Sequence, residues 1–119
     1  MDKMVRRMEV HDVEDVAALS AELGYPTTPE LVRERLARIT TNGNAICYVA
    51  TACGSVAGWT HAYAVFLIES PPYAELGGLV VSSGFKRQGI GSALVQAAED
   101  RARWDGLPRR YRRSSQIAS

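Results

Sequence analysis

Long apolar runs and cysteine are scarce in this sequence, and each scarcity excludes a class of protein. No apolar run approaches the roughly 18 residues needed to span a membrane. The opening residues, MDKMVRRMEV, carry charge but no apolar stretch, so we expect no signal peptide and a cytoplasmic location. Cys47 and Cys53 fall in a predicted hairpin, with Cys53 in its turn, where the two side chains would not face each other. We therefore expect two reduced thiols rather than a disulfide.

An excess of charge of one sign is also missing. The 14 basic and 13 acidic residues leave a formal net charge of +1, which does not indicate a general nucleic-acid binder. A hydrophobic share of 46% is ordinary for a globular protein, and 119 residues suffice for one small domain but not for two. We find no internal repeat or low-complexity segment, and we predict no metal site.

The apolar spacing predicts a mixed α/β domain with the element order β-α-α-β-β-β-α. Asp12 is the expected N-cap of the first helix, with Asp15 completing an imperfect capping box, and Gly24 ends that helix. Thr28 and Pro29 begin the second helix. The expected elements are strands over 4–10, 46–51, 56–67 and 73–81 and helices over 12–24, 28–42 and 89–104.

The most distinctive stretch runs from residue 79 to residue 98, LVVSSGFKRQGIGSALVQAA. Its branched apolar start predicts a buried strand, SSG breaks that strand, and GIG opens a helix with apolar residues near one face. Glycines at a helix start let a ligand approach the backbone, and the unpaired amide N–H groups there suit a phosphate. Lys86 and Arg87 add positive charge. These features predict a site for a ligand that contains pyrophosphate.

This loop and the strand before it resemble the acyl-CoA loop of the GNAT superfamily of N-acetyltransferases. The family pattern is Gln or Arg, two residues, Gly, one residue, and Gly or Ala, after a strand of the type L-x-V; here KRQGIG follows LVV. Lys86 departs from the first position, because lysine keeps the charge but lacks the planar fork of arginine. Most family contacts to pyrophosphate come from backbone N–H groups, so we expect this change to be tolerated. A dinucleotide fingerprint would need glycine where Leu94 stands, and the Walker pattern is absent.

The resemblance implies acetyl-CoA as the co-substrate and assigns its binding to the loop. Backbone N–H groups from Gln88 to Ser92 would hold the pyrophosphate, and Arg87 would pair with phosphate. Val80 and Val81 would pair with the pantetheine amides. The residues implied in cofactor binding are Leu79, Val80, Val81, Lys86, Arg87, Gln88, Gly89, Ile90, Gly91 and Ser92.

The resemblance also implies direct acetyl transfer to an amine, which must lose a proton in order to attack. Glu75, on the strand expected over 73–81, is the leading candidate for the base; the alternative is a solvated carboxylate at the start of a strand. His61, with Trp59 and Tyr63 on the same face of the neighbouring strand, is the second candidate; the alternative is a packed histidine.

Two neighbouring glycines, Gly77 and Gly78, predict a bulge or the close approach of a ligand, which would leave room for substrate. The family's tyrosine proton donor has no counterpart here, because Tyr111 lies in the final stretch, 105–119. The composition of that stretch, DGLPRRYRRSSQIAS, indicates a basic, disordered tail. We therefore divide the chain into a GNAT-like domain over 1–104 and a tail over 105–119.

A complete GNAT domain continues with a strand, a helix and two more strands after the helix expected over 89–104. We expect this chain to lack that part, as a truncated or frame-shifted form would, or to have its sheet completed by a partner chain. An unpaired sheet edge favours association, so we expect a homo-oligomer such as a dimer. The leading function is N-acetylation of a small amine or an amino-acid-derived substrate. The alternative is an inactive domain that binds acyl-CoA or oligomerises, and a basic-tailed nucleic-acid binder is the lesser alternative.

Overall fold

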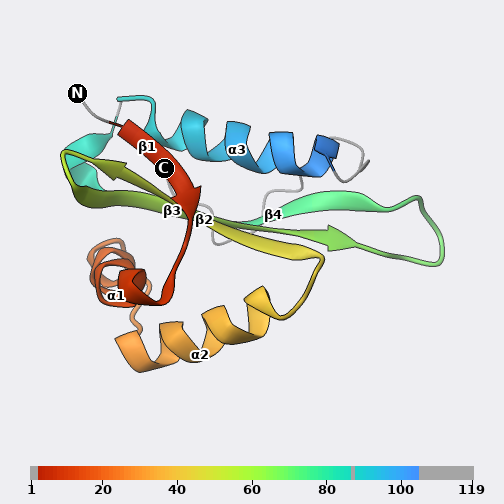
Figure 1. Cartoon of the computed structure of the whole chain (residues 1–119), viewed down its shortest axis with the longest axis horizontal. Helices are drawn as coiled ribbons and strands as arrows, with labels where there is room; N and C mark the ends of the chain where they lie inside the picture. The colour runs from red at the N-terminus through yellow and green to blue at the C-terminus, as the bar shows by residue number, and fades with distance from the viewer. Residues whose placement is uncertain (1–2, 87, 105–119) are drawn as a thin grey trace.

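A four-stranded antiparallel sheet separates two layers of helix in the computed structural model, which describes residues 3–86 and 88–104. The elements are β1 (Lys3–Arg7), η1 (Val10–Asp12), α1 (Val13–Glu22), α2 (Pro29–Thr40), β2 (Ala45–Ala52), β3 (Ser55–Val65), β4 (Tyr73–Val81), η2 (Ser83–Phe85) and α3 (Ile90–Trp104). The strands lie in the order β1-β2-β3-β4, with α3 on one face and α1 and α2 on the other (Figure 1). The predicted order of helices and strands is confirmed; the two short 3-10 turns, η1 and η2, were not predicted.

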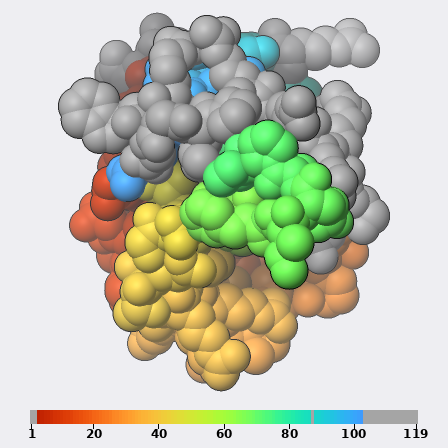
Figure 2. Space-filling model, turned by 90° about the vertical axis from the view of Figure 1, so that its right-hand side faces the viewer, coloured from red at the N-terminus to blue at the C-terminus, as the bar shows by residue number. Residues whose placement is uncertain are grey.

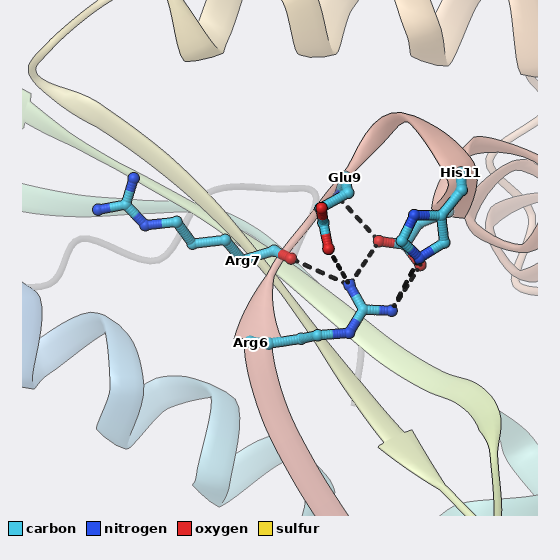
Figure 3. A network of polar contacts seen from close by, with 5 residues as sticks. Arg6, Arg7, Glu9 and His11 are labelled. Atoms are coloured by element: carbon cyan, nitrogen blue, oxygen red, sulfur yellow. Dashed lines mark hydrogen bonds and ion pairs between the residues drawn. The ribbon is translucent and has the colours of Figure 1, made fainter.

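The first strand ends at Arg7, earlier than predicted, and the chain then turns so that Glu9 and His11 lie near the Arg6 guanidinium (Figure 3). Both terminal nitrogens of the Arg6 guanidinium donate to the Asp12 carboxylate at 2.8 Å, and the Glu9 amide N–H donates to it at 2.8 Å. The Asp12 side chain therefore makes no capping hydrogen bond to α1. The predicted capping box of Asp12 and Asp15 is wrong, because the carboxylate turns back towards the strand.

The Arg6–Asp12 pair is an ionic anchor between β1 and the start of α1, and Asp12 is only 2% exposed. Burial alone would raise the pKa of Asp12, but the hydrogen bonds from Arg6 and Glu9 outweigh burial and hold that pKa below its usual 3.8. The same contact raises the pKa of Arg6. The pair is therefore charged at neutral pH.

A two-residue turn joins β2 to β3. Cys53 and Gly54 both have positive φ, 54° and 81°, as a type I′ turn requires. The turn predicted at these two residues is confirmed. Cys47 is buried in β2 opposite His61, and both cysteines are free thiols.

The predicted bulge in β4 is also confirmed. His61 pairs with Gly78 and Ala62 pairs with Leu76, so Gly77 is the extra residue. A Cβ on Gly77 would lie 2.7 Å from Cε1 of Tyr63 and 3.0 Å from Nδ1 of His61. A Cβ on Gly78 would lie 3.1 Å from the ring of Trp59. The two glycines therefore make room for the aromatic side chains of β3, and room for a substrate beside them stays a prediction.

The face covered by α3 is a close-packed apolar core. Ile90 and Leu94 of α3 are 1% and 0% exposed and lie against small residues of the sheet. Gly58 marks the closest approach, because a Cβ there would stand 2.7 Å from the Val80 carbonyl oxygen and 3.2 Å from both Ile90 and Leu94. This packing fixes the start of α3 relative to the end of β4.

The other face is covered by α1 and α2. Thr28 caps α2 by accepting a hydrogen bond from the Leu31 amide at 3.2 Å, and Pro29 occupies the first position, as predicted. The residues of α2 that contact the core of this face are Val32, Leu36 and Ile39.

The β3–β4 hairpin extends beyond both helical layers (Figure 1). Viewed from that side, its end forms a separate green lobe (Figure 2). The connection carries three exposed apolar side chains, Phe66, Leu67 and Ile68, at 61%, 39% and 106% exposure. These side chains contribute to neither core.

Candidate functional site

The turn from β4 into α3 presents backbone N–H groups, as the sequence predicted. Gly89 has φ +81°, and its carbonyl accepts the hydrogen bond of the Ala93 amide at 3.0 Å. The amides of Ile90, Gly91 and Ser92 precede that bond, so they have no acceptor within the helix. The helix dipole adds partial positive charge at the same point. An anion is the ligand that this arrangement suits.

The two glycines of this turn differ in what the fold requires of them. Gly89 needs to be glycine, because its positive φ is costly for any residue with a Cβ. Gly91 has no such φ, and a Cβ there would meet Val81 Cγ2 at 3.6 Å, an ordinary contact. The fold therefore explains Gly89 and leaves Gly91 without a packing reason.

The side chains of the loop differ in how far they are exposed. Ile90 is buried in the α3 core, so only its backbone is available to a ligand, whereas Lys86 and Ser92 are exposed. Gln88 holds a buried side-chain oxygen, Oε1, that has no hydrogen-bond partner among the described residues. Arg87, which the sequence predicted to pair with phosphate, lies outside the described residues.

Two distant residues hold this loop. The Lys3 ammonium donates a hydrogen bond to the Gln88 carbonyl. Glu22, the last residue of α1, accepts from the Ser83 hydroxyl at 2.7 Å and from its amide at 3.3 Å. Sequence reasoning missed both contacts, because nothing in the local pattern of Lys3 or Glu22 points to a loop more than 60 residues away.

Leu79, Val80 and Val81 lie in the last part of β4 and are all buried. They pair with Thr60, Trp59 and Gly58 of β3. β4 is the last strand in the order of the described sheet, so its second edge is the one that faces away from β3. The predicted backbone contacts of Val80 and Val81 with pantetheine would use that edge.

A cavity of about 420 Å³ lies between α1, α2 and the sheet. Its walls are mostly apolar, which is typical of a small-molecule site. The polar and aromatic lining residues among the described part of the chain are Ser20, Tyr25, Thr27, Arg35, Cys47, Trp59 and His61. Of these, Arg35 is the one that carries a fixed charge.

Trp59 and His61 line this cavity from β3, and the prediction that they share a face with Tyr63 is confirmed. The Trp59 indole donates to the Ser20 hydroxyl at 3.1 Å, which holds the ring against α1. Burial lowers the pKa of His61 below its usual 6.5, so the imidazole is neutral at pH 7. A neutral imidazole can accept a proton. Burial also raises the pKa of Cys47 to about 12, so this thiol is no nucleophile.

The structure separates the two candidate bases. Glu75 is not among the residues that line the cavity. Its carboxylate accepts a short hydrogen bond of 2.5 Å from the Tyr63 hydroxyl, and this bond raises the pKa of Tyr63 to about 12. Tyr63 in turn contacts the His61 ring, with centroids 5.2 Å apart. Glu75 therefore reaches the cavity wall only through Tyr63 and His61.

Within residues 3–86 and 88–104, no group of three or more His, Cys, Asp or Glu side chains is arranged to hold a metal ion. No helix in the same part of the chain is long and apolar enough to cross a membrane.

The family model of the acetyltransferase (GNAT) family matches residues 10–114. The match extends past residue 104, where the composition placed the boundary of the domain. No curated protein sequence matches the chain significantly.

Solved structures of acetyltransferases are similar to this one. A GNAT family acetyltransferase from Staphylococcus aureus has a TM-score of 0.80 and 20% identity, over 100% of this chain and 87% of its own. Glucosamine-6-phosphate N-acetyltransferase from Arabidopsis thaliana has a TM-score of 0.80 and 19% identity, over 97% of this chain and 84% of its own. An aminoglycoside 6'-N-acetyltransferase from Acinetobacter baumannii has a TM-score of 0.81 and 18% identity, over 96% of this chain and 80% of its own. At these identities the likeness concerns the fold.

Proposed function

Since the chain belongs to the GNAT family of acetyltransferases, we propose that it transfers the acetyl group of acetyl-CoA to a primary amine of a small molecule or an amino-acid-derived compound. The observation that carries this proposal is the glycine turn at the start of α3. Gly91 has no packing reason to be glycine, and it lies among amides that have no acceptor within the helix. A pyrophosphate held by these amides accounts for both features.

The reaction is a direct transfer. The amine nitrogen attacks the thioester carbonyl carbon, the new C–N bond forms, and the C–S bond breaks so that sulfur leaves as the thiolate. The proton lost by the amine goes to a base on the protein. Gln88, Gly89, Ile90, Gly91 and Ser92 bind the pyrophosphate through their backbone in this proposal.

We assign the base to His61 rather than to Glu75. His61 lines the cavity in which an amine would lie, and its imidazole is neutral at pH 7. Glu75 accepts a hydrogen bond from the Tyr63 hydroxyl, and the Tyr63 ring contacts His61, so Glu75 acts on the cavity wall only indirectly. Glu75 as the base remains the alternative, and the pH dependence of the two variants separates them.

Calorimetric titration with acetyl-CoA tests the cofactor site. The wild-type chain is expected to bind saturably, and Gly91→Glu to bind at least about 100-fold more weakly, because a carboxylate would stand where the phosphates bind. Gly43→Glu is the matched control: Gly43 is exposed, and no heavy atom lies within 4 Å of its Cβ position. Circular dichroism checks that each variant is folded. A folded wild-type chain that binds no acetyl-CoA would overturn the proposal.

The alternative of an inactive module that binds acyl-CoA predicts binding without turnover. Release of the CoA thiol in the presence of a panel of amines distinguishes the two.

We also propose a cytoplasmic homodimer, as the sequence predicted. Light scattering at micromolar concentration that records a clean monomer would count against the dimer.

A further inference from the structure

The described wall of the cavity between α1, α2 and the sheet carries positive charge and no negative charge. Arg35 contributes a guanidinium, and no Asp or Glu of the described residues lines the cavity. The imidazole of His61 and the thiol of Cys47 are both neutral at pH 7, because burial lowers the pKa of the first and raises that of the second. Among the described lining residues, Arg35 is therefore the one charged group that a cationic substrate would meet.

Arg35 is an exposed residue of α2, and it also lines the cavity. Val32, Leu36 and Ile39, which contact the core, lie three residues before it and one and four residues after it on the helix. A side chain at this spacing falls on the same stripe as the apolar residues. The aliphatic stem of an arginine can follow such a stripe while its charged head stays at the mouth of the cavity.

Arg35, unlike Arg38 on the same helix and Arg6 on β1, has no carboxylate partner among the described residues. Arg38, on the same helix, pairs with Glu34 at 3.1 Å, and Arg6 pairs with Asp12. Among the described residues no carboxylate forms an ion pair with Arg35. The guanidinium is therefore available to an anion from outside the chain.

A second group without a partner also lines the cavity. The Thr27 hydroxyl oxygen is buried and has no hydrogen-bond partner among the described residues. A buried hydroxyl without a partner costs free energy, and a bound oxygen atom would remove that cost. By contrast, the Ser20 hydroxyl, which also lines the cavity, already donates to the Val16 carbonyl and accepts from the Trp59 indole.

From these observations we propose that the acceptor amine carries an anionic group, a phosphate or a carboxylate, which pairs with Arg35 and accepts a hydrogen bond from Thr27. The planar fork of a guanidinium suits either group. The inference rests on the proposed acetyl transfer, because it assigns the substrate class of the same cavity. An acceptor of this class excludes polycationic amines as the preferred substrates.

The test uses the full chain, acetyl-CoA and pairs of amines that differ only in the anionic group. Glucosamine 6-phosphate against glucosamine examines phosphate, and an amino acid against its amide examines carboxylate. Release of the CoA thiol gives kcat/KM for each. The anionic member of at least one pair is expected to be preferred by about 10- to 100-fold, the range of a charge-assisted hydrogen bond. A preference for the neutral members, or for a polycationic aminoglycoside, would overturn the inference.

Variants of α2 assign the preference to Arg35. Arg35→Gln is expected to remove most of the preference through KM, and Arg35→Lys to keep part of it, because lysine retains charge without the fork. Arg33→Gln is the matched control, because Arg33 is exposed on the same helix and does not line the cavity. A preference that survives in Arg35→Gln would contradict the inference.

A binding measurement keeps the inference distinct from the proposed function. Each amine is titrated by calorimetry into the chain saturated with CoA, which needs no turnover. If nothing is acetylated but the anionic amine binds and Arg35→Gln abolishes that binding, the transferase proposal fails and the anionic subsite stands. If neutral amines are acetylated and Arg35→Gln changes neither binding nor rate, the transferase stands and the subsite fails. Absence of both binding and turnover with every amine overturns the subsite as well.

Discussion

The two faces of the sheet are packed in opposite ways. Against α3, apolar side chains close over small sheet residues, and Leu94 is 0% exposed. Against α1 and α2, the packing leaves a cavity of about 420 Å³ into which Trp59 and His61 project. The sealed face supplies rigidity to the glycine turn, and the hollow face offers space and polar groups.

Neighbouring residues of β3 carry this contrast within one strand. Thr60 points to the α3 side, is 0% exposed, and donates its hydroxyl to the Gly78 carbonyl at 2.6 Å. His61 points to the cavity. Successive residues of a strand face opposite sides, so one step along the chain passes from a side chain in the closed face to one that lines the cavity.

The largest expected effect is on turnover at the hollow face. His61→Gln should lower kcat by about 100- to 10,000-fold, the usual contribution of a general base, with little change in stability. In the wild type, kcat should fall as the pH drops through a pKa below 6.5, because protonated His61 accepts no proton. Steady-state rates between pH 5 and 9 measure both.

Thr60→Val is the matched control on the sealed face. It should cost about 1 to 2 kcal/mol in the free energy of unfolding, because the Gly78 carbonyl loses its buried donor. Turnover should stay within about threefold, since no reacting group is removed. A His61→Gln chain that turns over normally would end its assignment as the base.

A pair of leucines compares the packing of the two faces directly. Leu94→Ala should destabilise the chain by about 3 to 5 kcal/mol, because it opens a void in a closed core. Leu36→Ala should cost about 2 kcal/mol, because Leu36 already borders a cavity and adds less new empty surface. Urea unfolding gives both values, and equal costs would mean that the two faces are packed alike.

The ion pair of Arg6 and Asp12 is expected to contribute slightly less to the free energy of unfolding than Leu94 does. Arg6→Met should cost about 3 kcal/mol at pH 7, because it leaves the Asp12 carboxylate, 2% exposed, without a countercharge. In the wild type the pKa of Asp12 is held below 3.8, so its stabilisation is complete above 3.8 and is lost as the pH falls through the lower value.

In Arg6→Met the pKa of Asp12 is expected to lie above its usual value instead of below it. With Arg6 gone, burial is the largest remaining influence on this pKa, and burial raises it. The destabilisation should therefore shrink as the pH falls from 7 towards 4.5. Arg7→Met, at an exposed neighbour, is the control and should change stability by less than about 0.5 kcal/mol. A cost for Arg6→Met that does not depend on pH would contradict this account.

The smallest effect should come from Glu75. Glu75→Gln keeps a hydrogen-bonding group beside the Tyr63 hydroxyl and removes nothing from the cavity wall, so kcat should change by less than about threefold. If kcat instead falls more than about tenfold and the acidic limb of its pH profile disappears, Glu75 and not His61 is the base.

Local patterns were enough to predict most of this fold. The element order, the Cys53–Gly54 turn, the cap of α2 by Thr28 and the bulge at Gly77 all follow from residues adjacent in sequence. What failed or was missed depends on contacts between distant residues. Asp12 occupies the predicted N-cap position of α1, but its carboxylate pairs with Arg6 and makes no capping hydrogen bond.

In the candidate site, too, local features could be predicted, whereas features that depend on contacts between distant residues could not. The glycine turn was predictable, because its chemistry is local to residues 89–92. The place of Arg35 beside the cavity was not, because the sequence indicates only an exposed charge on a helix, and the packing of α2 on the sheet is what puts this exposed side chain at the cavity wall. The sequence ranked Glu75 above His61 as the base, and it does not reveal that Tyr63 donates a hydrogen bond to this carboxylate; which of the two is the base stays a prediction.

Glu22 gives the molecule a further property. This residue ends the helix that walls the cavity, and its carboxylate holds the amide and hydroxyl of Ser83, just before the glycine turn. We expect a ligand in the turn to stiffen the end of α1 through this contact, so that an amine arriving afterwards meets an ordered wall. We expect a compulsory order of substrate addition, with acetyl-CoA first, and Glu22→Gln to relax that order towards random.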